Sequence, residues 1–326
     1  MAYREDGKVV VIGGGTGLSV LLRGLKRFTE DITAIVTVAD DGGSSGMLRA
    51  DLGMLPPGDI RACLLSLANT EPAMERLLSF RFMTGGLKGQ SFGNLFIAAM
   101  NEIYGNFGMA VKETSNVLNI TGKVLPVTLQ QMDLVAELEN GTLCRGESNI
   151  PLVTLREKTK IKRMKLERQN INALPECLQA IEDADLIVLG PGSLYTSIIP
   201  NLLVRGISDA IKRSKAKKLY ICNIMTQAGE TDSYSVIDHV DAIIEHSDAE
   251  ILDFCIVNNQ IIDEKSRINY IKEHSEQVLA SKKDEQELKK RNIKLIEDNY
   301  LEIKNGYVRH NALHLSQKLL TIADYY

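Results

Sequence analysis

The sequence of 326 residues contains no tryptophan, and aromatic residues make up only 5% of it. Proteins that bind nucleic acid commonly stack bases on aromatic rings and attract phosphates with a positive field. This chain has few rings, a formal net charge of -4 and a pI near 5.8. We therefore expect no binding to DNA or RNA.

Paired metal-ligand and disulfide patterns are also missing. No two of the five cysteines form a CxxC pair, and most of them lie within apolar runs: Cys63, Cys144, Cys177, Cys222 and Cys255. This pattern predicts reduced, buried cysteines in a cytoplasmic protein. His310 has no second histidine at ligand spacing, so it does not indicate a transition-metal site.

No uncharged stretch approaches the ~20 residues that a membrane-spanning helix needs. The N-terminal MAYREDGK lacks the apolar segment of a signal peptide. We expect a cytoplasmic protein with no membrane span. Hydrophobic residues make up 44% of the chain, which is enough for a large core, and we expect one α/β domain over residues 1–326.

Short apolar runs alternate with helical periods along most of the chain. This order is typical of a Rossmann-like, doubly wound and mainly parallel sheet with helices on both faces. The expected strands are Val9–Ile12, Thr33–Val38, Ala184–Leu189 and Leu219–Ile224, and two of the expected helices are Ser19–Phe28 and Val236–His246.

The middle of the chain predicts a small antiparallel insertion over about residues 120–168. Three strand-like runs, Lys123–Thr128, Leu134–Glu139 and Thr142–Leu155, surround the hairpin signal Asn140-Gly141. The basic stretch Arg156–Arg168 follows, and its alternating lysines favour a charged edge strand over an anion-binding patch.

The first expected strand ends in a glycine-rich loop, KVVVIGGGTGL, in which Gly13, Gly14, Gly15, Thr16 and Gly17 precede a helix. Such a loop lets backbone N–H groups and the positive helix end approach a phosphate. Leu18 or Val20 stands where the dinucleotide fingerprint has its third glycine, which weakens but leaves open NAD binding. The GK[ST] ending of a P-loop is absent. The alternative is a tight turn that binds nothing.

Carboxylates follow the second expected strand. Asp40 and Asp41 precede GGSSG, and parallel strands present their carboxyl ends to one crevice, so we expect this pair to face the glycine loop. The two residues are candidates for holding Mg²⁺, a ribose or a substrate proton. The alternative is an Asx turn. Asp59, after PPG, is a helix cap that could also present a free oxygen to a ligand.

Further candidate ligand-binding residues lie in three later loops. Asn94 opens an apolar helix, and the stretch GPGSLYTS follows the strand Ala184–Leu189. Asn223 lies at the end of the strand Leu219–Ile224, and the loop after it supplies Gln227, Glu230 and Thr231. A nucleobase or a second phosphate could dock on GPGSLYTS. The candidates within it are Gly190, Gly192, Ser193, Tyr195, Thr196 and Ser197.

Five stretches together resemble the signature sequences of the YvcK-like gluconeogenesis factors (UPF0052): GGGTGLSVLLRGLK, VTVADDGGSSGMLR, PPGDIR, FGNL and GPGSLYTSIIPNLLV. The resemblance runs from about Lys8 nearly to the C-terminus. It implies a CofD-like nucleotide-binding fold and a bacterial, cytosolic protein associated with cell shape and growth on gluconeogenic carbon. It also implies a UDP-sugar ligand such as UDP-N-acetylglucosamine, with Tyr270 and Arg309 at positions linked to its binding.

The same superfamily contains the phospholactate transferase of F420 biosynthesis. The metal-binding aspartate of those enzymes would fall on Asp40 or Asp41, but their GPSNP-like guanine loop is replaced here by GPGSLYTS. We therefore favour a non-catalytic nucleotide-sugar sensor that forms homo-oligomers and contacts proteins of cell-wall synthesis or central metabolism. The alternatives are a Mg²⁺-dependent transferase using Asp40, Asp41 and Asp59, and an NAD-binding protein.

Overall fold

A computed structural model of the protein describes residues 7–247, 250–304 and 306–325. Residues 1–6, on which most of the expectation about a signal peptide rests, lie outside the described part. Within the described part, no helix combines the length and hydrophobicity needed to cross a bilayer.

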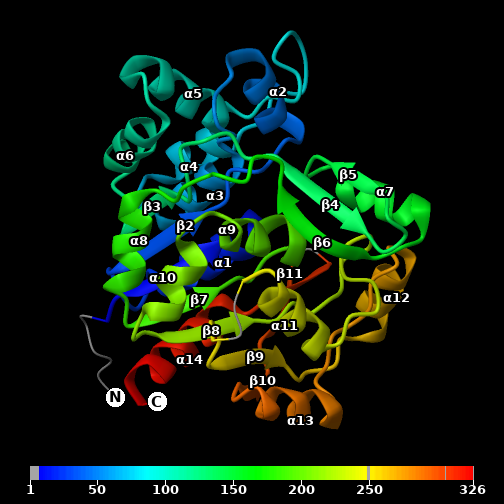
Figure 1. The fold of residues 1–326 in the computed structure, drawn as a ribbon. Helices are drawn as coiled ribbons and strands as arrows, with labels where there is room; N and C mark the ends of the chain where they lie inside the picture. The colour runs from blue at the N-terminus through cyan, green and yellow to red at the C-terminus, as the bar shows by residue number, and fades with distance from the viewer. Residues whose placement is uncertain (1–6, 248–249, 305, 326) are drawn as a thin grey trace.

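A seven-stranded sheet, in which every neighbouring pair is parallel, runs through the molecule (Figure 1). Its strands are β1 (Val9–Gly13), β2 (Ile32–Val36), β3 (Lys123–Pro126), β7 (Leu186–Leu189), β8 (Lys217–Ile221), β9 (Phe254–Asn258) and β10 (Lys294–Asp298).

The strand order confirms the Rossmann-like fold. From β1 the sheet extends through β2 and β3 in one direction and through β7, β8, β9 and β10 in the other. The direction of winding therefore reverses between β1 and β7, which pair from Val9 with Leu186 to Ile12 with Leu189. In open α/β sheets a ligand crevice forms at this reversal, outside the carboxyl ends of the strands.

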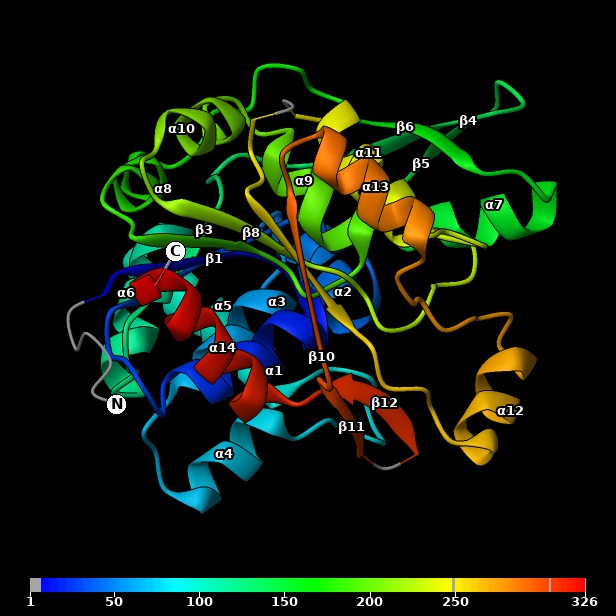
Figure 2. The same cartoon turned by 90° about the horizontal axis from the view of Figure 1, so that it is seen from below.

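Helices cover both faces of the sheet, as the sequence predicts. Figure 2 shows α1 and α14 on one face and α8, α10, α11 and α13 on the other. The helices are α1 (Gly15–Leu25), α2 (Gly43–Leu52), α3 (Gly58–Leu67), α4 (Pro72–Ser79), α5 (Phe92–Tyr104), α6 (Phe107–Val117), α7 (Ile150–Glu157), α8 (Pro175–Glu182), α9 (Ile199–Leu202), α10 (Ile207–Arg213), α11 (Val236–Glu245), α12 (Glu264–Lys272), α13 (Lys282–Lys290) and α14 (Ala312–Tyr325), with a π-helical turn, η1, at Leu194–Ile198.

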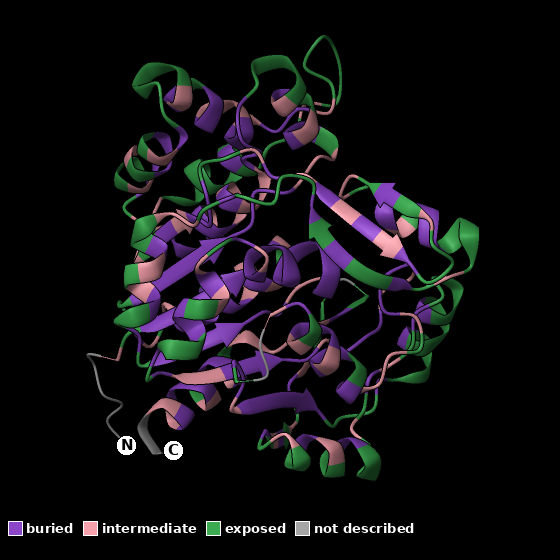
Figure 3. Ribbon diagram, in the orientation of Figure 1, coloured by how far each residue is buried: buried purple, intermediate pink, exposed green. Residues whose placement is uncertain are grey.

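The core lies along the central strands, which are buried on both faces (Figure 3). Every residue of β1, β2 and β7 is buried. This explains why these strands are continuous apolar runs without alternation in the sequence. All five cysteines are free and buried, as predicted.

The antiparallel insertion is present, with different boundaries. β4 (Leu134–Leu138) lies between β5 (Leu143–Arg145) and β6 (Ile161–Leu166). Gly141 has a φ of 86° in the β4–β5 turn, which confirms the predicted hairpin. The prediction that Lys123–Thr128 belongs to this insertion is wrong, because β3 pairs with β2 in the main sheet.

Two further expectations for this region need correction. The expected strand Thr142–Leu155 is β5 followed by α7, because Pro151 lies in the first turn of a helix, where a missing N–H costs nothing. The edge strand within Arg156–Arg168 is confirmed as β6, but it starts only at Ile161. Lys162 and Lys165 of β6 both donate to Glu137 of β4 at 2.8 Å, so this edge is charged.

The last part of the chain returns to the sheet and then to α1. After β10 the chain forms a hairpin of β11 (Leu301–Lys304) and β12 (Tyr307–His310). Helix α14 packs against α1, and β12 also contacts α1. The hairpin therefore delivers Arg309 and His310 to the N-terminal half of the molecule (Figure 2).

Candidate functional site

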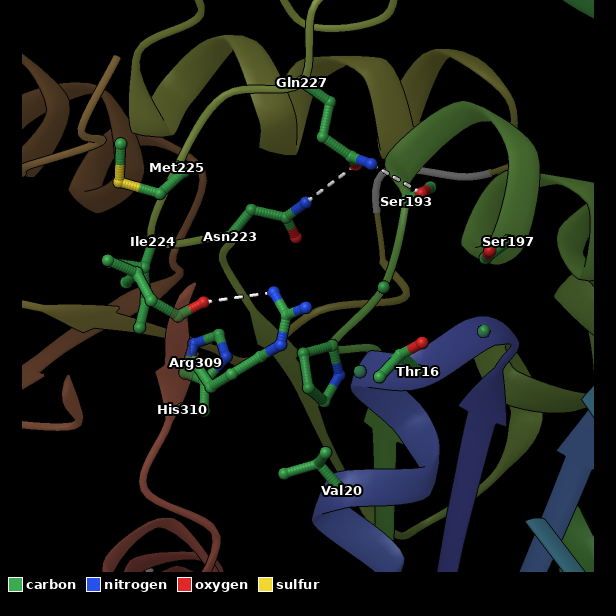
Figure 4. Close-up of a pocket in the computed structure, with 15 residues that line it drawn as sticks. Thr16, Val20, Ser193, Ser197, Asn223, Ile224, Met225, Gln227, Arg309 and His310 are labelled. Atoms are coloured by element: carbon green, nitrogen blue, oxygen red, sulfur yellow. Dashed lines mark hydrogen bonds between the residues drawn. The ribbon is translucent and has the colours of Figure 1, made fainter. Parts of the chain in front are cut away.

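A cleft of about 310 Å³ opens beside the glycine loop, at the reversal between β1 and β7 (Figure 4). Its volume is at the lower end of the range usual for small-molecule sites. It is lined by Gly15, Thr16, Gly17, Val20, Pro191, Gly192, Ser193, Ser197, Asn223, Ile224, Met225, Gln227, Val308, Arg309 and His310.

The glycine loop forms one wall of the cleft. Gly14 caps α1, and the helix begins at Gly15, whose φ of 68° favours glycine. The predicted first helix therefore starts four residues earlier, inside the loop itself. A Cβ on Gly17 would lie 2.7 Å from the carbonyl oxygen of Pro191, so glycine is needed for this close approach. The first amides of α1 consequently border the cleft.

The loop after β7 forms the adjacent wall, and only part of GPGSLYTS reaches the cleft. Gly192, Ser193 and Ser197 line it. Tyr195 and Thr196 turn into the protein instead: the Tyr195 hydroxyl lies 2.8 Å from that of Tyr234, and the Thr196 hydroxyl donates to Glu230 at 3.2 Å. Gly190 precedes a cis peptide bond to Pro191 and holds the turn.

The loop after β8 supplies a chain of side-chain amides. The Asn223 Nδ2 donates to Gln227 Oε1 at 3.3 Å, and Gln227 Nε2 donates to Ser193 Oγ at 2.8 Å (Figure 4). Ile224 and Met225 follow Asn223 and add apolar surface to the cleft. Two neighbouring loops at the strand ends are thus joined by side chains.

Arg309 and His310 close the cleft from β12. An N–H of the Arg309 guanidinium donates to the carbonyl oxygen of Val308 at 3.2 Å, and the group lies 5.3 Å from the centre of the Tyr307 ring. Burial lowers the pKa of His310 to about 4, and the ring donates to the carbonyl of Cys222. At neutral pH the positive side chain here is therefore Arg309, while His310 is uncharged.

Besides Tyr195, Thr196 and the carboxylates, the predicted ligand-binding residues that do not line this cleft are Gly13, Gly14, Gly190, Tyr270 and Asn94. The Tyr270 hydroxyl accepts a hydrogen bond from the Val308 N–H at 2.9 Å, and its ring packs with Ile224 and Met225, behind the wall. Asn94 is 2% exposed and donates to Ser44 Oγ at 3.1 Å, between α2 and α5. A direct ligand contact by any of these residues stays a prediction.

The predicted carboxylates lie on the other side of the glycine loop and do not line the cleft. Asp59 accepts the N–H of Gly15. The Asp40 Oδ1 accepts the N–H of Gly42 at 2.9 Å, which is the Asx turn considered above. Asp41 accepts the N–H groups of Glu147 and Ser148, each at 2.9 Å, and so ties the insertion to the end of β2.

These carboxylates form an acidic cluster with two residues that sequence reasoning did not select as site residues. Burial and the charge of Asp40 raise the pKa of Asp59 to about 6. Burial and the surrounding carboxylates raise the pKa of Glu147 to about 8. Burial raises the pKa of Glu230 to about 7, although hydrogen bonds from Thr196 act to lower this pKa. Glu147 reaches the cluster from the insertion, so no local sequence signal marks it.

The acidic cluster does not form a ready metal site. Among the described residues, no group of three or more His, Cys, Asp or Glu is arranged to hold a metal ion. Both oxygens of Asp41 already accept backbone hydrogen bonds, and one oxygen of Asp40 does so too. Magnesium binding by Asp40 and Asp41 stays a prediction.

The cleft also contains Gln227, from the loop that the sequence predicts to face the crevice, and residues that the sequence prediction missed. The missed residues are His310 and the apolar Val20, Ile224 and Met225. The position of Ile224 and Met225 in the loop after a parallel strand is a usable signal, since such loops face the crevice. His310 carries no such signal, because the β11–β12 hairpin places it.

Comparison with known proteins agrees with this geometry. A model of the family described as 2-phospho-L-lactate transferase CofD matches residues 9–301. The chain belongs to the CofD family. A protein named gluconeogenesis factor from Halalkalibacterium halodurans is 50% identical over 313 residues, which are 96% of this chain and 95% of the relative. The gluconeogenesis factor of Bacillus subtilis is 47% identical over 316 residues, covering 97% and 98%.

A solved structure gives the same result. The crystal structure of a UPF0052-family protein from Bacillus halodurans superposes with a TM-score of 0.92 at 48% identity, covering 97% of this chain and 100% of that one. The resemblance and the fold inferred from the motifs are thereby confirmed. Membership of the CofD family does not by itself decide whether this chain catalyses a reaction.

Proposed function

We propose that this protein binds a nucleotide sugar, with UDP-N-acetylglucosamine as the first candidate, and acts as a non-catalytic sensor. The observation that supports this most is the composition of the cleft. Loop amides of Gly15–Gly17 and the Arg309 guanidinium lie on the same cavity, and both are donors suited to a diphosphate.

The rest of the cleft suits the remainder of such a ligand. Apolar side chains of Val20, Ile224 and Met225 offer surface to a base or sugar ring, and the Asn223 and Gln227 amides offer hydrogen bonds. A pocket with apolar walls and a few placed polar groups is what small-molecule ligands generally need.

The acidic cluster supports a sensor more than an enzyme. Asp41 holds the insertion and Asp59 holds the glycine loop through hydrogen bonds to backbone N–H groups. These contacts give both carboxylates a structural role that needs no chemistry on a ligand. The same contacts link the cleft wall to the insertion, which gives a bound nucleotide sugar a route to a surface that a partner could recognise.

The cellular part of the proposal rests on the relatives. Two of them are named gluconeogenesis factor. We propose that the ligand state of this protein alters its contacts with proteins of cell-wall synthesis or central metabolism in the cytoplasm, and thereby supports cell shape and growth on gluconeogenic carbon. The proposal includes a homo-oligomer, which light scattering would test.

Calorimetry tests the ligand class. The purified chain is titrated with UDP-N-acetylglucosamine, UDP-glucose, NAD and GDP, each with and without Mg²⁺, and the samples are analysed for product afterwards. We expect the UDP-sugars to bind without metal and without turnover. Preference for NAD or GDP, or any metal-dependent product, would refute the sensor.

A Mg²⁺-dependent transferase is the second candidate. One observation favours it: the charge of Asp40 helps to raise the pKa of Asp59, and both carboxylates help to raise the pKa of Glu147. A divalent cation would relieve that repulsion. If Asp40→Asn or Asp41→Asn abolishes ligand binding only in the presence of Mg²⁺, the result supports the transferase function. Equal binding with and without metal in these variants counts against it.

A further inference from the structure

The side chains of Asn223, Gln227 and Ser193 form a relay across the cleft. Asn223 donates to Gln227 at 3.3 Å, and Gln227 donates to Ser193 at 2.8 Å. The Gln227 residue is fixed in turn, because its backbone N–H donates to Thr231 Oγ1 at 2.9 Å and its carbonyl accepts the Glu230 and Thr231 N–H groups. The relay therefore has a stable middle member.

One atom of the relay has no partner. The Asn223 Oδ1 is buried and accepts no hydrogen bond within the described structure. Figure 4 shows the amide nitrogen of Asn223 directed to Gln227 and the oxygen directed toward the interior of the cleft. A buried acceptor without a donor is costly, and a ligand that supplies the donor recovers that cost.

The direction of the relay couples its two ends. If Ser193 accepts from Gln227, its own O–H proton is free to donate to an anion beside the glycine loop. If Ser193 instead donated to Gln227, both amides would have to turn over, and Asn223 would present a donor to the cleft. An anion at the Ser193 end thus requires an acceptor at the Asn223 end.

We infer that this relay makes Asn223 a specificity-determining residue, which selects ligands carrying a hydrogen-bond donor where they meet the Asn223 side-chain oxygen. Gln227 is a positioning residue that keeps the Asn223 amide in this orientation. The donor is the N3–H of the base or the 2′-O–H of the ribose. The inference rests on the proposed nucleotide-sugar binding. It adds that the ligand must present a hydrogen-bond donor to Asn223.

Calorimetry with four probes tests the inference: UDP, 3-methyluridine diphosphate, 2′-deoxyuridine diphosphate and inorganic pyrophosphate. The first analogue lacks the base N–H and the second lacks a ribose O–H. We expect one of the two analogues to bind the unmodified chain about tenfold more weakly than UDP, and that analogue identifies the donor.

The variant Asn223→Ala should bind UDP and that analogue with equal affinity, while its affinity for pyrophosphate stays unchanged. Gln227→Ala should also lose the discrimination, because Asn223 can then turn over. Ser193→Ala should weaken all four probes by one common factor, pyrophosphate included. Asn116→Ala is the matched control, since Asn116 is exposed on α6 and lines no part of the cleft.

The outcomes separate this inference from the proposed function. If neither analogue binds more weakly than UDP, or if Asn223→Ala weakens pyrophosphate as much as UDP, the relay does not select the ligand, although nucleotide binding stands. If the unmodified chain binds none of the nucleotides, the proposed function fails and this inference fails with it.

Discussion

The two sides of the glycine loop differ in what their polar groups do. On the cleft side, the Asn223 oxygen has no partner, and Arg309 lines an open cavity. On the acidic side, Asp41 and Asp59 accept hydrogen bonds from backbone N–H groups. The carboxylates that dominate the motif therefore fix backbone segments in place, and less conspicuous side chains line the cleft.

The protonation of the two sides differs as well. Burial raises the pKa of Asp59, Glu147 and Glu230 on the acidic side, and neighbouring carboxylates add to the shifts of Asp59 and Glu147. On the cleft side burial lowers the pKa of His310 to about 4. Near neutral pH the acidic side is thus partly protonated, and the cleft keeps the charge of Arg309 for an anion.

Among the variants considered, Gly17→Ala should cause the largest loss of stability and ligand affinity. The new Cβ would lie 2.7 Å from the Pro191 oxygen and 2.9 Å from its carbonyl carbon, so backbone must move. We expect a loss of unfolding free energy of roughly 1–3 kcal/mol and about a hundredfold weaker binding of UDP-N-acetylglucosamine, as two loop amides shift. Gly86→Ala is the control, because nothing lies within 4 Å of its Cβ. Unchanged calorimetric affinity in Gly17→Ala would contradict the loop's role.

Arg309→Ala should weaken the same ligand by roughly tenfold to a hundredfold, since a charge-assisted contact to phosphate is lost. Arg309→Lys should recover part of this, because it keeps the charge but not the planar fork. Thermal unfolding should stay unchanged. Equal Kd values for all three chains would show that the diphosphate lies elsewhere.

Glu230→Gln tests the protonation of the acidic side through the pH dependence of the unfolding free energy. Burial raises the pKa of Glu230 to about 7 from the usual 4.5, so the folded state holds this proton more tightly than the unfolded state. Its contribution to stability is thus lost as pH rises from about 4.5 to about 7. We expect the variant to be more stable by roughly 2 kcal/mol at pH 8 and equal at pH 5.

Urea unfolding at the two pH values measures this effect. Glu285→Gln, at an exposed position on α13, is the control and should show no such difference. A variant that is less stable than the unmodified protein at pH 8 would mean that the folded state stabilises the ionised form of Glu230, against a raised pKa.

Asp41→Asn should have the smallest effect. The amide can accept only one of the two N–H groups of Glu147 and Ser148 that the carboxylate accepts. We expect a loss of about 1 kcal/mol in unfolding free energy and a metal-free affinity for UDP-N-acetylglucosamine within about twofold of the original. A large loss of metal-free affinity would place Asp41 in the ligand site, against the division described here.

Much of the fold was predictable from local pattern. Continuous apolar runs marked β1, β2, β7 and β8, and their alternation with helices indicated the parallel sheet. The errors arose where a pattern was short. Lys123–Pro126 was assigned to the insertion because a four-residue strand carries no sign of its partner, and α7 was taken for a strand because periodicity over eight residues is ambiguous.

The site was predictable in part. Glycines at the end of β1 and the loops after β7 and β8 follow from topology, because parallel strands end at a common edge. Tyr195, Thr196 and Tyr270 carry the right chemistry but turn into the protein. Side-chain direction depends on neighbouring elements, which composition and spacing do not specify.

Local patterns along the chain are enough to predict the class of fold and the glycine-rich loop, because both depend on interactions between residues close along the chain. The packing of distant segments, in contrast, places Asp41 against the insertion and brings Arg309 to the cleft from β12. It also decided that Asn223 keeps an unpartnered oxygen. These facts depend on contacts between residues distant along the chain, which form only when the sheet, the insertion and the C-terminal hairpin pack together.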